Sequence, residues 1–234
     1  MEWIYGRQVA RLALAPGARR RPQRLATTTA ALTAIGRRPP AGLPVDIVPA
    51  PELDRLTGTH DHQGVAVLVD GYPYAGAREL VAADLLVVLD EVSDPRNLGA
   101  VARSALASGA DGLVLPRRRA AGVTPAAVKA SAGATEHLRI AHVSNVAAYL
   151  KELQRGGFWV YGAAGDAARS YVDLDYAGKV ALVLGSEGRG LRPLVARTCD
   201  VLASIPMRGP VESLNVSVAA ALLLFEARRQ REAR

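Results

Sequence analysis

Cysteine is almost absent from this sequence: Cys199 is the only one among 234 residues. A single cysteine cannot form a disulfide within the chain, and it excludes a metal site built on a cysteine cluster. The four histidines have no spacing that indicates a metal site, and His60 and His62 flank Asp61 in what reads as a solvated loop. We therefore expect neither a disulfide framework nor a bound metal.

Long apolar runs are also lacking. No stretch approaches the ~18 consecutive apolar residues that are needed to span a bilayer. The first residues, MEWIYGRQ, contain an acidic side chain and lack the apolar core of a secretory signal. Half of the residues are nevertheless hydrophobic, which is enough for a sizeable core. These features predict a soluble, cytoplasmic protein without a membrane partner.

Lysine is scarce, whereas arginine is abundant: three of the 29 basic residues are lysines and 26 are arginines, and the formal net charge is +7. Arginine makes bidentate contacts with phosphate and stacks on bases, and a basic chain is attracted to nucleic acid. A GC-rich genome also raises the arginine content, so this composition favours RNA or DNA without proving either. One cluster, Arg19, Arg20, Arg21 and Arg24, either grips phosphates or forms a solvated basic loop.

The pattern of the chain changes near residue 85. Residues 1–70 mix short helical and extended patterns with basic, turn-rich stretches such as 15–24, and residues 71–84 have the Gly, Pro and weak periodicity of a linker. From there on, six short runs rich in Val, Ile and Leu alternate with helical segments, which is typical of a mostly parallel sheet covered on both faces. We expect an α/β fold, with a small α/β domain over 1–70 and a larger α/β domain over 85–234.

Three loops that follow predicted strands carry polar residues. Ligands gather at the carboxyl ends of the strands in open parallel sheets, so chemistry is expected there. In the first loop, DPRNLGAVARSA, Asp94 and Pro95 suit the start of a helix and Gly109 suits its end. Asn97 then lies at the mouth of this helix, with Arg103 about one and two-thirds turns further in. An Asn turn followed by a solvated arginine is the alternative interpretation.

The second loop, LVLGSEGRGL, is rich in glycine. Gly185, Gly188 and Gly190 permit a close approach of the backbone, and Glu187 lies between them although a simple tight turn requires no carboxylate. The loop lacks the lysine of the phosphate-binding G-x-x-x-x-G-K-[ST] motif and does not match G-x-G-x-x-G. Its late position in the chain also excludes a Rossmann site, whose glycines follow the first strand.

The third loop, in IPMRGPVESLNVSVAAALLLFEA (205–227), precedes an apolar helix. Ser213, Leu214 and Asn215 lie at the helix start, directly before the buried-looking segment. A helix N-terminus carries unsatisfied N–H groups and a partial positive charge, so these residues either cap the helix or bind a ligand. The sequence of this segment alone leaves both interpretations open.

Taken in this order, the three segments closely resemble the three motifs of the SpoU (TrmH-like) 2′-O-ribose RNA methyltransferases of the SPOUT superfamily. The phrases IYGRQVARLAL and DHQGVAV further resemble the bacterial subgroup that methylates a guanosine ribose in the peptidyl-transferase region of 23S rRNA and has an L30e-like N-terminal domain. The resemblance implies a trefoil knot in the C-terminal domain, a homodimer that packs through its last helix, an RNA substrate, and S-adenosylmethionine as cofactor. It implies no metal.

The resemblance also implies which residues form the site. The positions that match the family's cofactor pocket are Leu184, Gly185, Gly188, Ile205, Pro206, Met207, Ser213, Leu214 and Asn215. The positions that match its catalytic residues are Asn97, Arg103, Glu187, Ser213 and Asn215. In the family this arginine is the proposed base, which leaves the roles of base and orienting cation open. Because a guanidinium is effectively always protonated, we expect Arg103 to orient the ribose hydroxyl or a phosphate and to stabilise the developing alkoxide, while Glu187 and Asn97 orient this arginine and the nucleotide. Lys129, Ser131 and Glu136 match family positions without an assigned role.

The leading hypothesis is a cofactor-dependent methyltransferase that modifies a ribose 2′-hydroxyl in 23S rRNA. Within the same enzyme class, the alternatives are a tRNA 2′-O-methyltransferase and an rRNA methyltransferase that confers antibiotic resistance. From another class, the alternative is an RNA-binding ribosome-assembly factor that keeps the fold without catalysis. The nucleotide that is methylated does not follow from the sequence.

Overall fold

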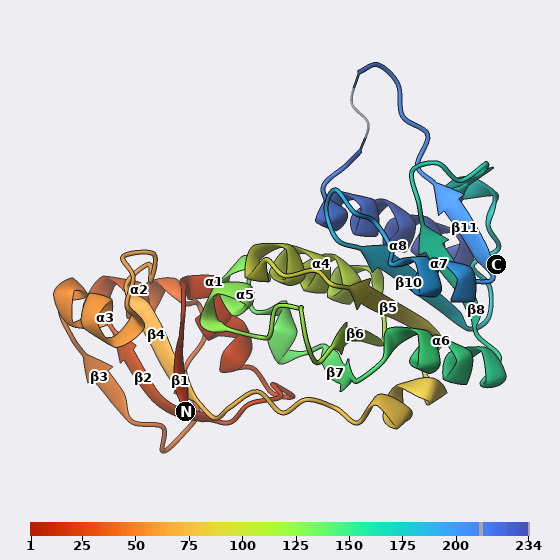
Figure 1. The fold of residues 1–234 in the computed structure, drawn as a ribbon. Coiled ribbons are helices and arrows are strands. Elements are labelled where there is room, and N and C mark those ends of the chain that lie inside the picture. Colours follow the sequence, from red (N-terminus) through yellow and green to blue (C-terminus); the bar gives the residue numbers. More distant parts are fainter. Residues whose placement is uncertain (211–212, 234) are drawn as a thin grey trace.

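The computed structural model describes residues 1–210 and 213–233 and begins with a small mixed sheet (Figure 1). Its strands, in the order β1-β4-β2-β3, are β1 (Glu2–Tyr5), β2 (Pro22–Thr27), β3 (Val45–Ile47) and β4 (Val65–Val69). The helices of this part are α1 (Arg7–Ala13), α2 (Thr29–Ala34) and α3 (Ala50–Thr57). The expected small α/β domain is thereby confirmed.

The second sheet has seven strands in the order β7-β6-β5-β10-β8-β11-β9, and every pairing in it is parallel. Its strands are β5 (Leu85–Asp90), β6 (Gly112–Pro116), β7 (Arg139–Val143), β8 (Trp159–Ala163), β9 (Arg169–Ser170), β10 (Val180–Gly185) and β11 (Val201–Ser204). All six expected runs form strands, and β5 and β6 are buried along their whole length. Burial on both faces explains why these runs show no polar alternation.

Helices cover both faces of this parallel sheet. They are α4 (Pro95–Ser108), α5 (Pro125–Ala130), α6 (Val146–Arg155), α7 (Pro193–Thr198) and α8 (Val216–Glu232), with short 3-10 turns η1 (Ala77–Ala82), η2 (Ala134–Glu136) and η3 (Tyr171–Asp173). Leu85 and Val87 of β5 belong to the core beneath α4, α5 and α8, whereas Leu86 and Val88 belong to the core beneath α6 and α7. Among the described helices, none is both long and apolar enough to cross a bilayer.

The bounds of α4 follow the local signals in the sequence. The side chain of Asp94 caps the helix by accepting a hydrogen bond from the backbone N–H of Arg96 at 2.8 Å, and Pro95 occupies the first turn. Gly109 ends the helix in the left-handed conformation, with φ 84°. This confirms the predicted start and end, and it fixes where Asn97 and Arg103 lie on the helix.

The basic stretch at 15–24 is turn-rich up to residue 20, as expected, but Arg19 and Arg20 are bonded within the protein instead of lying in a solvated loop. It enters β2, which lies between β4 and β3, and Arg20 is buried with 0% of its side chain exposed. Arg24 forms an ion pair with Asp46, and Arg19 donates a hydrogen bond to the carbonyl of Pro73 at 2.9 Å. The hypothesis of a four-arginine phosphate grip is therefore wrong for Arg20, whose charge is used inside the protein.

Arg20 joins the two parts of the chain through a buried ion pair. Its guanidinium donates to both carboxylate oxygens of Glu136, at 2.9 and 2.6 Å, and to Glu2 at 2.5 Å. Glu136 is also fully buried, which gives this family-matched residue a structural role. The guanidinium lies 5.5 Å from the ring centre of Tyr72, whose hydroxyl donates to the carbonyl oxygens of Thr135 and Leu138. These contacts tie the N-terminal sheet to η2.

Apolar packing crosses the same junction. Ile4 and Val9 of the N-terminal part belong to one core cluster with Leu98 of α4 and Val128 of α5. The expected linker 71–84 contains η1, and its Leu80 is fully buried against the larger sheet. Residues 71–84 therefore pack on the larger sheet instead of forming a free tether, while the exact domain bounds stay a prediction.

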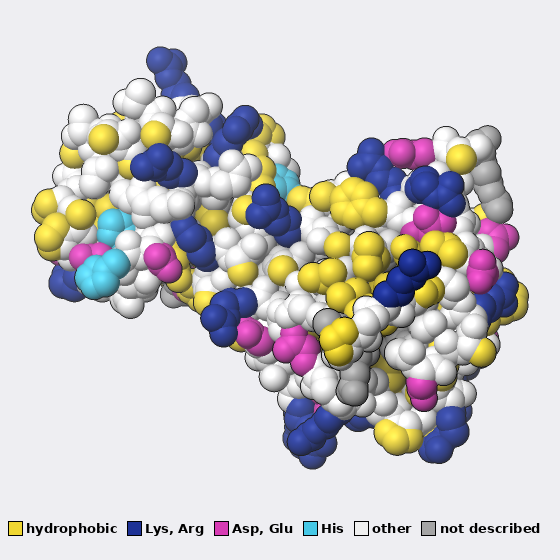
Figure 2. All heavy atoms as spheres, turned by 90° about the horizontal axis from the view of Figure 1, so that it is seen from above, with side chains coloured by type: hydrophobic (Ala, Val, Ile, Leu, Met, Phe, Trp, Pro, Cys, Tyr) yellow, Lys and Arg dark blue, Asp and Glu magenta, His cyan; other side chains and the backbone are white. Residues whose placement is uncertain are grey.

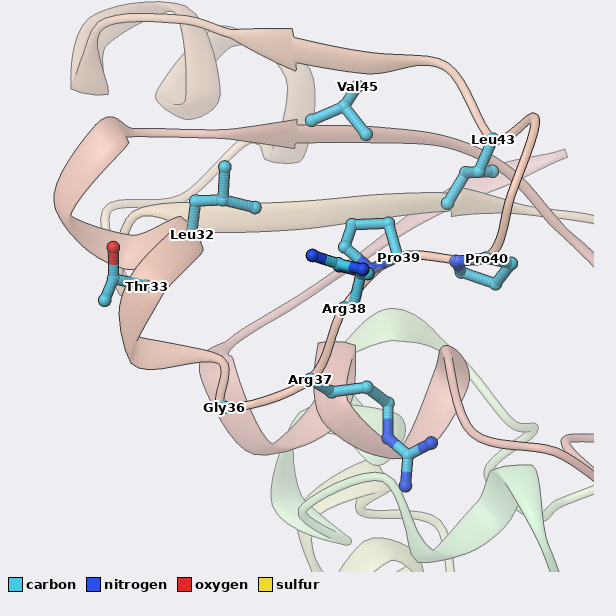
Figure 3. A pocket seen from close by; sticks show the side chains of 9 residues that line it. All are labelled: Leu32, Thr33, Gly36, Arg37, Arg38, Pro39, Pro40, Leu43 and Val45. Carbon is cyan, nitrogen blue, oxygen red and sulfur yellow. The ribbon is translucent and has the colours of Figure 1, made fainter.

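A shallow hollow lies on the N-terminal part, beside α2 and the edge strand β3. It is lined by Leu32, Thr33, Gly36, Arg37, Arg38, Pro39, Pro40, Leu43 and Val45 (Figure 3). These residues come from α2, the loop that follows it, and the edge strand β3. No described hydrogen bond joins this segment to the larger sheet, so the hollow belongs to the N-terminal part alone.

We predict that breaking the buried ion pair destabilises the whole chain. Either Arg20→Met or Glu136→Leu leaves a buried charge without its partner and should lower the free energy of unfolding by about 3–5 kcal/mol. The double variant removes both charges, so its loss of unfolding free energy should be much smaller than the sum of the two single losses. Urea unfolding followed by circular dichroism measures this. As a control, Arg24→Met removes an exposed pair and should change the free energy of unfolding far less than either buried substitution. Additive losses in the double variant would contradict the prediction.

Candidate active site

Three loops meet at the carboxyl edge of the parallel sheet. The side-chain amide of Asn97, in the first turn of α4, donates to Glu187 Oε1 at 2.9 Å. The amide of Asn215, which precedes α8, donates to Asn97 Oδ1 at 3.0 Å and also to Glu187. One residue from each motif thus takes part in a closed set of hydrogen bonds. The expectation that these three loops form one site agrees with this geometry.

Asn215 both caps a helix and builds the site. Its side-chain oxygen accepts hydrogen bonds from the backbone N–H and the hydroxyl of Ser217, at 2.8 and 2.6 Å, which caps α8. Its side-chain nitrogen donates hydrogen bonds to Asn97 and Glu187. The two interpretations that the sequence left open are therefore compatible, because the two ends of one amide perform both tasks. Ser217, absent from the expected site residues, joins through this cap.

Arg103 lies outside the hydrogen-bonded cluster. Its side chain is exposed, and within the described ranges it forms no hydrogen bond or ion pair. It follows Asn97 by six positions, which places it ~9 Å further along the helix axis and on another side of the helix. Glu187 and Asn97 bind Asn215 instead of orienting this arginine. The guanidinium of Arg103 is consequently free to contact a bound molecule.

The loop after β10 is held tightly by its own backbone. Ser186 and Gly190 exchange two backbone hydrogen bonds, at 2.9 and 3.2 Å. A Cβ atom on Gly185 would lie 2.0 Å from the carbonyl carbon of Gly190, whereas one on Gly188 would meet nothing within 4 Å. Glycine is required at position 185 because the chain closes on itself there. Glu187 is thereby presented at the tip of a short, fixed hairpin.

A residue that the sequence interpretation missed anchors the end of this loop. Asp90, the last residue of β5, is fully buried and accepts hydrogen bonds from Arg192: one from the backbone N–H at 2.9 Å and one from Nε at 2.8 Å. This hydrogen bonding raises the pKa of Arg192 above its ordinary value. A carboxylate that ends an apolar strand at the carboxyl edge of the sheet is the sequence signal that identifies such an anchor.

Apart from Leu184 in β10, the remaining predicted cofactor residues lie on the two described loop segments between β11 and α8. Leu184 is buried in β10, Ile205 and Leu214 are half-buried, and Pro206, Met207 and Ser213 are exposed. Val211 and Glu212, between these loops, lie outside the described residues.

These two loops have groups that suit a small organic ligand. The backbone N–H groups of Met207 and Leu214 donate to no group in residues 1–210 and 213–233. Free backbone donors beside apolar side chains such as Ile205 and Leu214 are the usual lining of a pocket for a ligand with a flat ring and polar ends. In the part of the chain that the structure describes, no three His, Cys, Asp or Glu side chains gather where they could hold a metal ion.

Comparison with known proteins identifies relatives of both parts of the chain. Residues 84–225 match the sequence model of the SpoU rRNA Methylase family, and residues 3–75 match one described as RNA 2′-O ribose methyltransferase substrate binding. An uncharacterized tRNA/rRNA methyltransferase of Mycobacterium ulcerans is 46% identical over 205 residues, which are 84% of this chain and 66% of the relative. The chain thus spans just under two thirds of that relative. The putative TrmH family tRNA/rRNA methyltransferase YacO of Bacillus subtilis is 43% identical over 81% of this chain and 79% of the relative.

Solved structures resemble the whole chain. A putative RNA methyltransferase of the TrmH family from Porphyromonas gingivalis superposes with a TM-score of 0.80 at 31% identity, over 98% of this chain and 90% of that one. The SpoU methyltransferase AviRb from Streptomyces viridochromogenes, in complex with the cofactor AdoMet, gives a TM-score of 0.80 at 26% identity, over 99% and 91%. Both parts of the fold therefore occur together in these structures.

The close backbone approach at Gly185 can be tested by substitution. Gly185→Ala should force the Gly190 carbonyl away and destabilise the protein by more than Gly188→Ala, which costs only the ~1–2 kcal/mol of a left-handed non-glycine residue. Unfolding free energies of the two variants measure the difference. A smaller loss in Gly185→Ala than in Gly188→Ala would show that the hairpin does not depend on this close approach.

Proposed function

Because the chain belongs to the SpoU rRNA methylase family, we propose that it transfers a methyl group from S-adenosylmethionine to a ribose 2′-hydroxyl of RNA, with a guanosine of 23S rRNA as the substrate. The observation that carries this proposal is the closed hydrogen-bond set of Asn97, Glu187 and Asn215, which unites the three motif loops at one sheet edge. The match of residues 3–75 to a substrate-binding model of RNA 2′-O ribose methyltransferases supports RNA as the substrate. We place the activity in the cytoplasm.

The cofactor would be held by the loops after β10 and β11 and before α8. S-adenosylmethionine, when bound, supplies an electrophilic methyl group. Half-buried Ile205 and Leu214 offer apolar surface to a flat adenine. The N–H groups of Met207 and Leu214, which have no acceptor among the described residues, offer polar recognition. The other proposed lining residues are Leu184, Gly185, Gly188, Pro206, Ser213 and Asn215. The trefoil knot stays a prediction for these loops.

Arg103 is the proposed catalytic residue. Its exposed guanidinium, free of described partners, can donate hydrogen bonds to the ribose 2′-hydroxyl or a neighbouring phosphate. A fixed positive charge would stabilise the alkoxide as the hydroxyl proton passes to solvent water. Holding the oxygen in line with the methyl carbon would lower the entropic part of the barrier. The proposed positioning residues are Glu187, Asn97 and Asn215. Because they bind one another, they hold the three loops at fixed positions relative to one another.

Three alternatives stay open beside this proposal. The relatives are named tRNA/rRNA methyltransferases, so a tRNA ribose is an alternative substrate. An rRNA methyltransferase that confers antibiotic resistance is another. Mapping 2′-O-methyl sites in the RNA of a deletion strain distinguishes the substrates, and tight cofactor binding without methyl transfer to any RNA would indicate an assembly factor.

The outward face of α8 supports a homodimer, which we propose as the working assembly. Val218, Leu222 and Phe225 follow one another at helical spacing and are 47%, 37% and 45% exposed. The opposite face, including Ala220, Leu223 and Leu224, is buried. Figure 2 views the molecule from above, the side on which α8 lies in Figure 1, and it shows hydrophobic side chains gathered on that surface of the larger lobe. An exposed apolar stripe of this kind is typical of a protein interface.

Removing the apolar stripe should abolish the dimer. We expect the unmodified protein to sediment as a dimer at micromolar concentration and Leu222→Asp to sediment as a monomer, because a charge would be buried at the interface. Val172→Asp, which changes an exposed apolar residue outside α8, should leave the dimer intact. A monomeric unmodified protein would contradict the proposal.

Arg103→Ala should separate catalysis from cofactor binding. We expect the single-turnover rate of methyl transfer to unmodified 23S rRNA fragments to fall about 100- to 1,000-fold, since losing one well-placed charge commonly has this effect. Cofactor affinity, measured by calorimetry with a metal chelator present, should change no more than a few-fold. Arg103→Lys should restore little of the rate, because an ammonium cannot reproduce the planar guanidinium.

The control for this experiment is Arg96→Ala, which removes an exposed arginine of the same helix that pairs with Asp94. It should change neither rate nor affinity substantially. Near-normal transfer in Arg103→Ala would remove Arg103 from the catalytic role. Loss of cofactor binding in the presence of chelator would contradict the metal-free site.

A further inference from the structure

A second group of arginines lies at the same sheet edge as the site. Arg117, Arg118 and Arg119 directly follow β6, and all three side chains are exposed. Strand β6 pairs in parallel with β5, whose end leads through Asp90 into the loop before α4. The carboxyl ends of paired parallel strands are neighbours, so this arginine loop flanks the loop that carries Asn97.

Ion pairs connect the arginine loop to the site. Arg119 Nη1 lies 3.4 Å from Glu91 Oε1, and Glu91 in turn lies 3.6 Å from Arg192 Nη1. Arg192 is held by buried Asp90 at 2.6 Å and ends the hairpin that presents Glu187. A continuous chain of charges therefore joins the arginine loop to the hairpin of the candidate active site.

The arginine loop and the neighbouring loop before α4 each contain one residue with an unfavourable backbone conformation. Glu91 and Arg119, the two partners of one ion pair, have φ values of 62° and 60°. A non-glycine residue in this left-handed region costs roughly 1–2 kcal/mol, and such strain persists where surrounding contacts impose it, commonly at binding sites. The backbone N–H of Ala121 also donates to the carbonyl of Val92 at 2.9 Å. The loop is consequently fixed in place before any ligand arrives.

The side chains of Arg117 and Arg118 can contact a ligand, because they take no part in these ion pairs. Within residues 1–210 and 213–233, neither side chain forms a hydrogen bond or an ion pair. Burial and the nearby charge of Arg117 lower the pKa of His142, whose ring stacks on Tyr74 with a centroid distance of 4.0 Å. Tyr74 is 37% exposed. Guanidinium groups and exposed aromatic rings, here connected through His142, are the elements with which proteins bind single-stranded RNA.

We propose that Arg117 and Arg118 bind phosphates of the RNA strand next to the nucleotide that reacts, and that Arg119, held by Glu91, positions their loop. The proposal rests on the function proposed above, because it assigns the flanking part of the same RNA substrate. The occupant is RNA and not an acidic protein, since Tyr74, which is exposed and stacks on His142 near Arg117, adds an aromatic surface to the positive charge. The chain of ion pairs couples this phosphate site to the hairpin of Glu187.

The test compares two charge-matched double variants. R117Q/R118Q removes two positive charges at the carboxyl edge of the sheet. K151Q/R155Q removes two exposed positive charges from the C-terminal half of α6, which returns to the amino end of β8 at the opposite edge. The probes are in vitro transcribed, unmodified 23S rRNA fragments and poly-glutamate, with affinities measured over a range of salt concentrations. Cofactor affinity and circular dichroism confirm that each variant is folded.

We expect R117Q/R118Q to weaken RNA binding about 10- to 30-fold at ~0.15 M salt and to reduce the log-log salt slope by up to ~0.7–0.9 per lost phosphate contact. KM for RNA should rise with kcat nearly unchanged, while K151Q/R155Q shows a much smaller effect. Equal losses in both variants, or no change in R117Q/R118Q, would overturn the proposal. So would a loss of poly-glutamate binding without loss of RNA binding.

Failure of this site and failure of the proposed function give different results. If the unmodified protein transfers no methyl group but R117Q/R118Q alone loses RNA affinity, the phosphate site stands and the methyltransferase assignment falls. If the unmodified protein methylates RNA and R117Q/R118Q does so with unchanged KM, the assignment stands and the phosphate site is refuted.

Discussion

The side chain of Asn215 joins three loops that lie far apart in the sequence. Its oxygen fixes the start of α8, and its nitrogen binds Asn97 at the start of α4 and Glu187 at the tip of the glycine hairpin. Because α8 packs along α4, the helix packing and the site geometry depend on one another. The site is thus a product of tertiary structure, although each loop is recognisable separately.

Arginine serves two different purposes in this chain. Arg20 is buried between Glu2 and Glu136 and joins the two parts of the molecule, and Arg192 holds the glycine hairpin through Asp90. Arg103, Arg117 and Arg118 are exposed and free of described partners. A net charge of +7 therefore says little by itself about which arginines face RNA. Burial and pairing decide this, because a guanidinium inside a bidentate ion pair cannot contact phosphate.

The sequence was most informative where the signals are local. Asp94, Pro95 and Gly109 mark the ends of α4, and continuous apolar runs identify β5 and β10, because caps and buried strands depend on few neighbours. Strand β2 was missed, since its pairing with β3 and β4 depends on distant residues. For the same reason the partners of Glu136 and Asp90, which lie 116 and 102 residues away, were not predictable, although the place of Asp90 at the end of an apolar strand marks it as a candidate anchor. The freedom of Arg103 from Glu187 likewise appears only in three dimensions.

The most direct test of the central claim is to identify the methylated nucleoside. Unmodified 23S rRNA is incubated with the protein and isotopically labelled S-adenosylmethionine, digested to nucleosides, and analysed by mass spectrometry. The account predicts about one labelled methyl group per rRNA molecule, recovered as 2′-O-methylguanosine, and a loss of this label when excess S-adenosylhomocysteine competes with the labelled cofactor. Label on a base, or no label on any RNA despite bound cofactor, would contradict it.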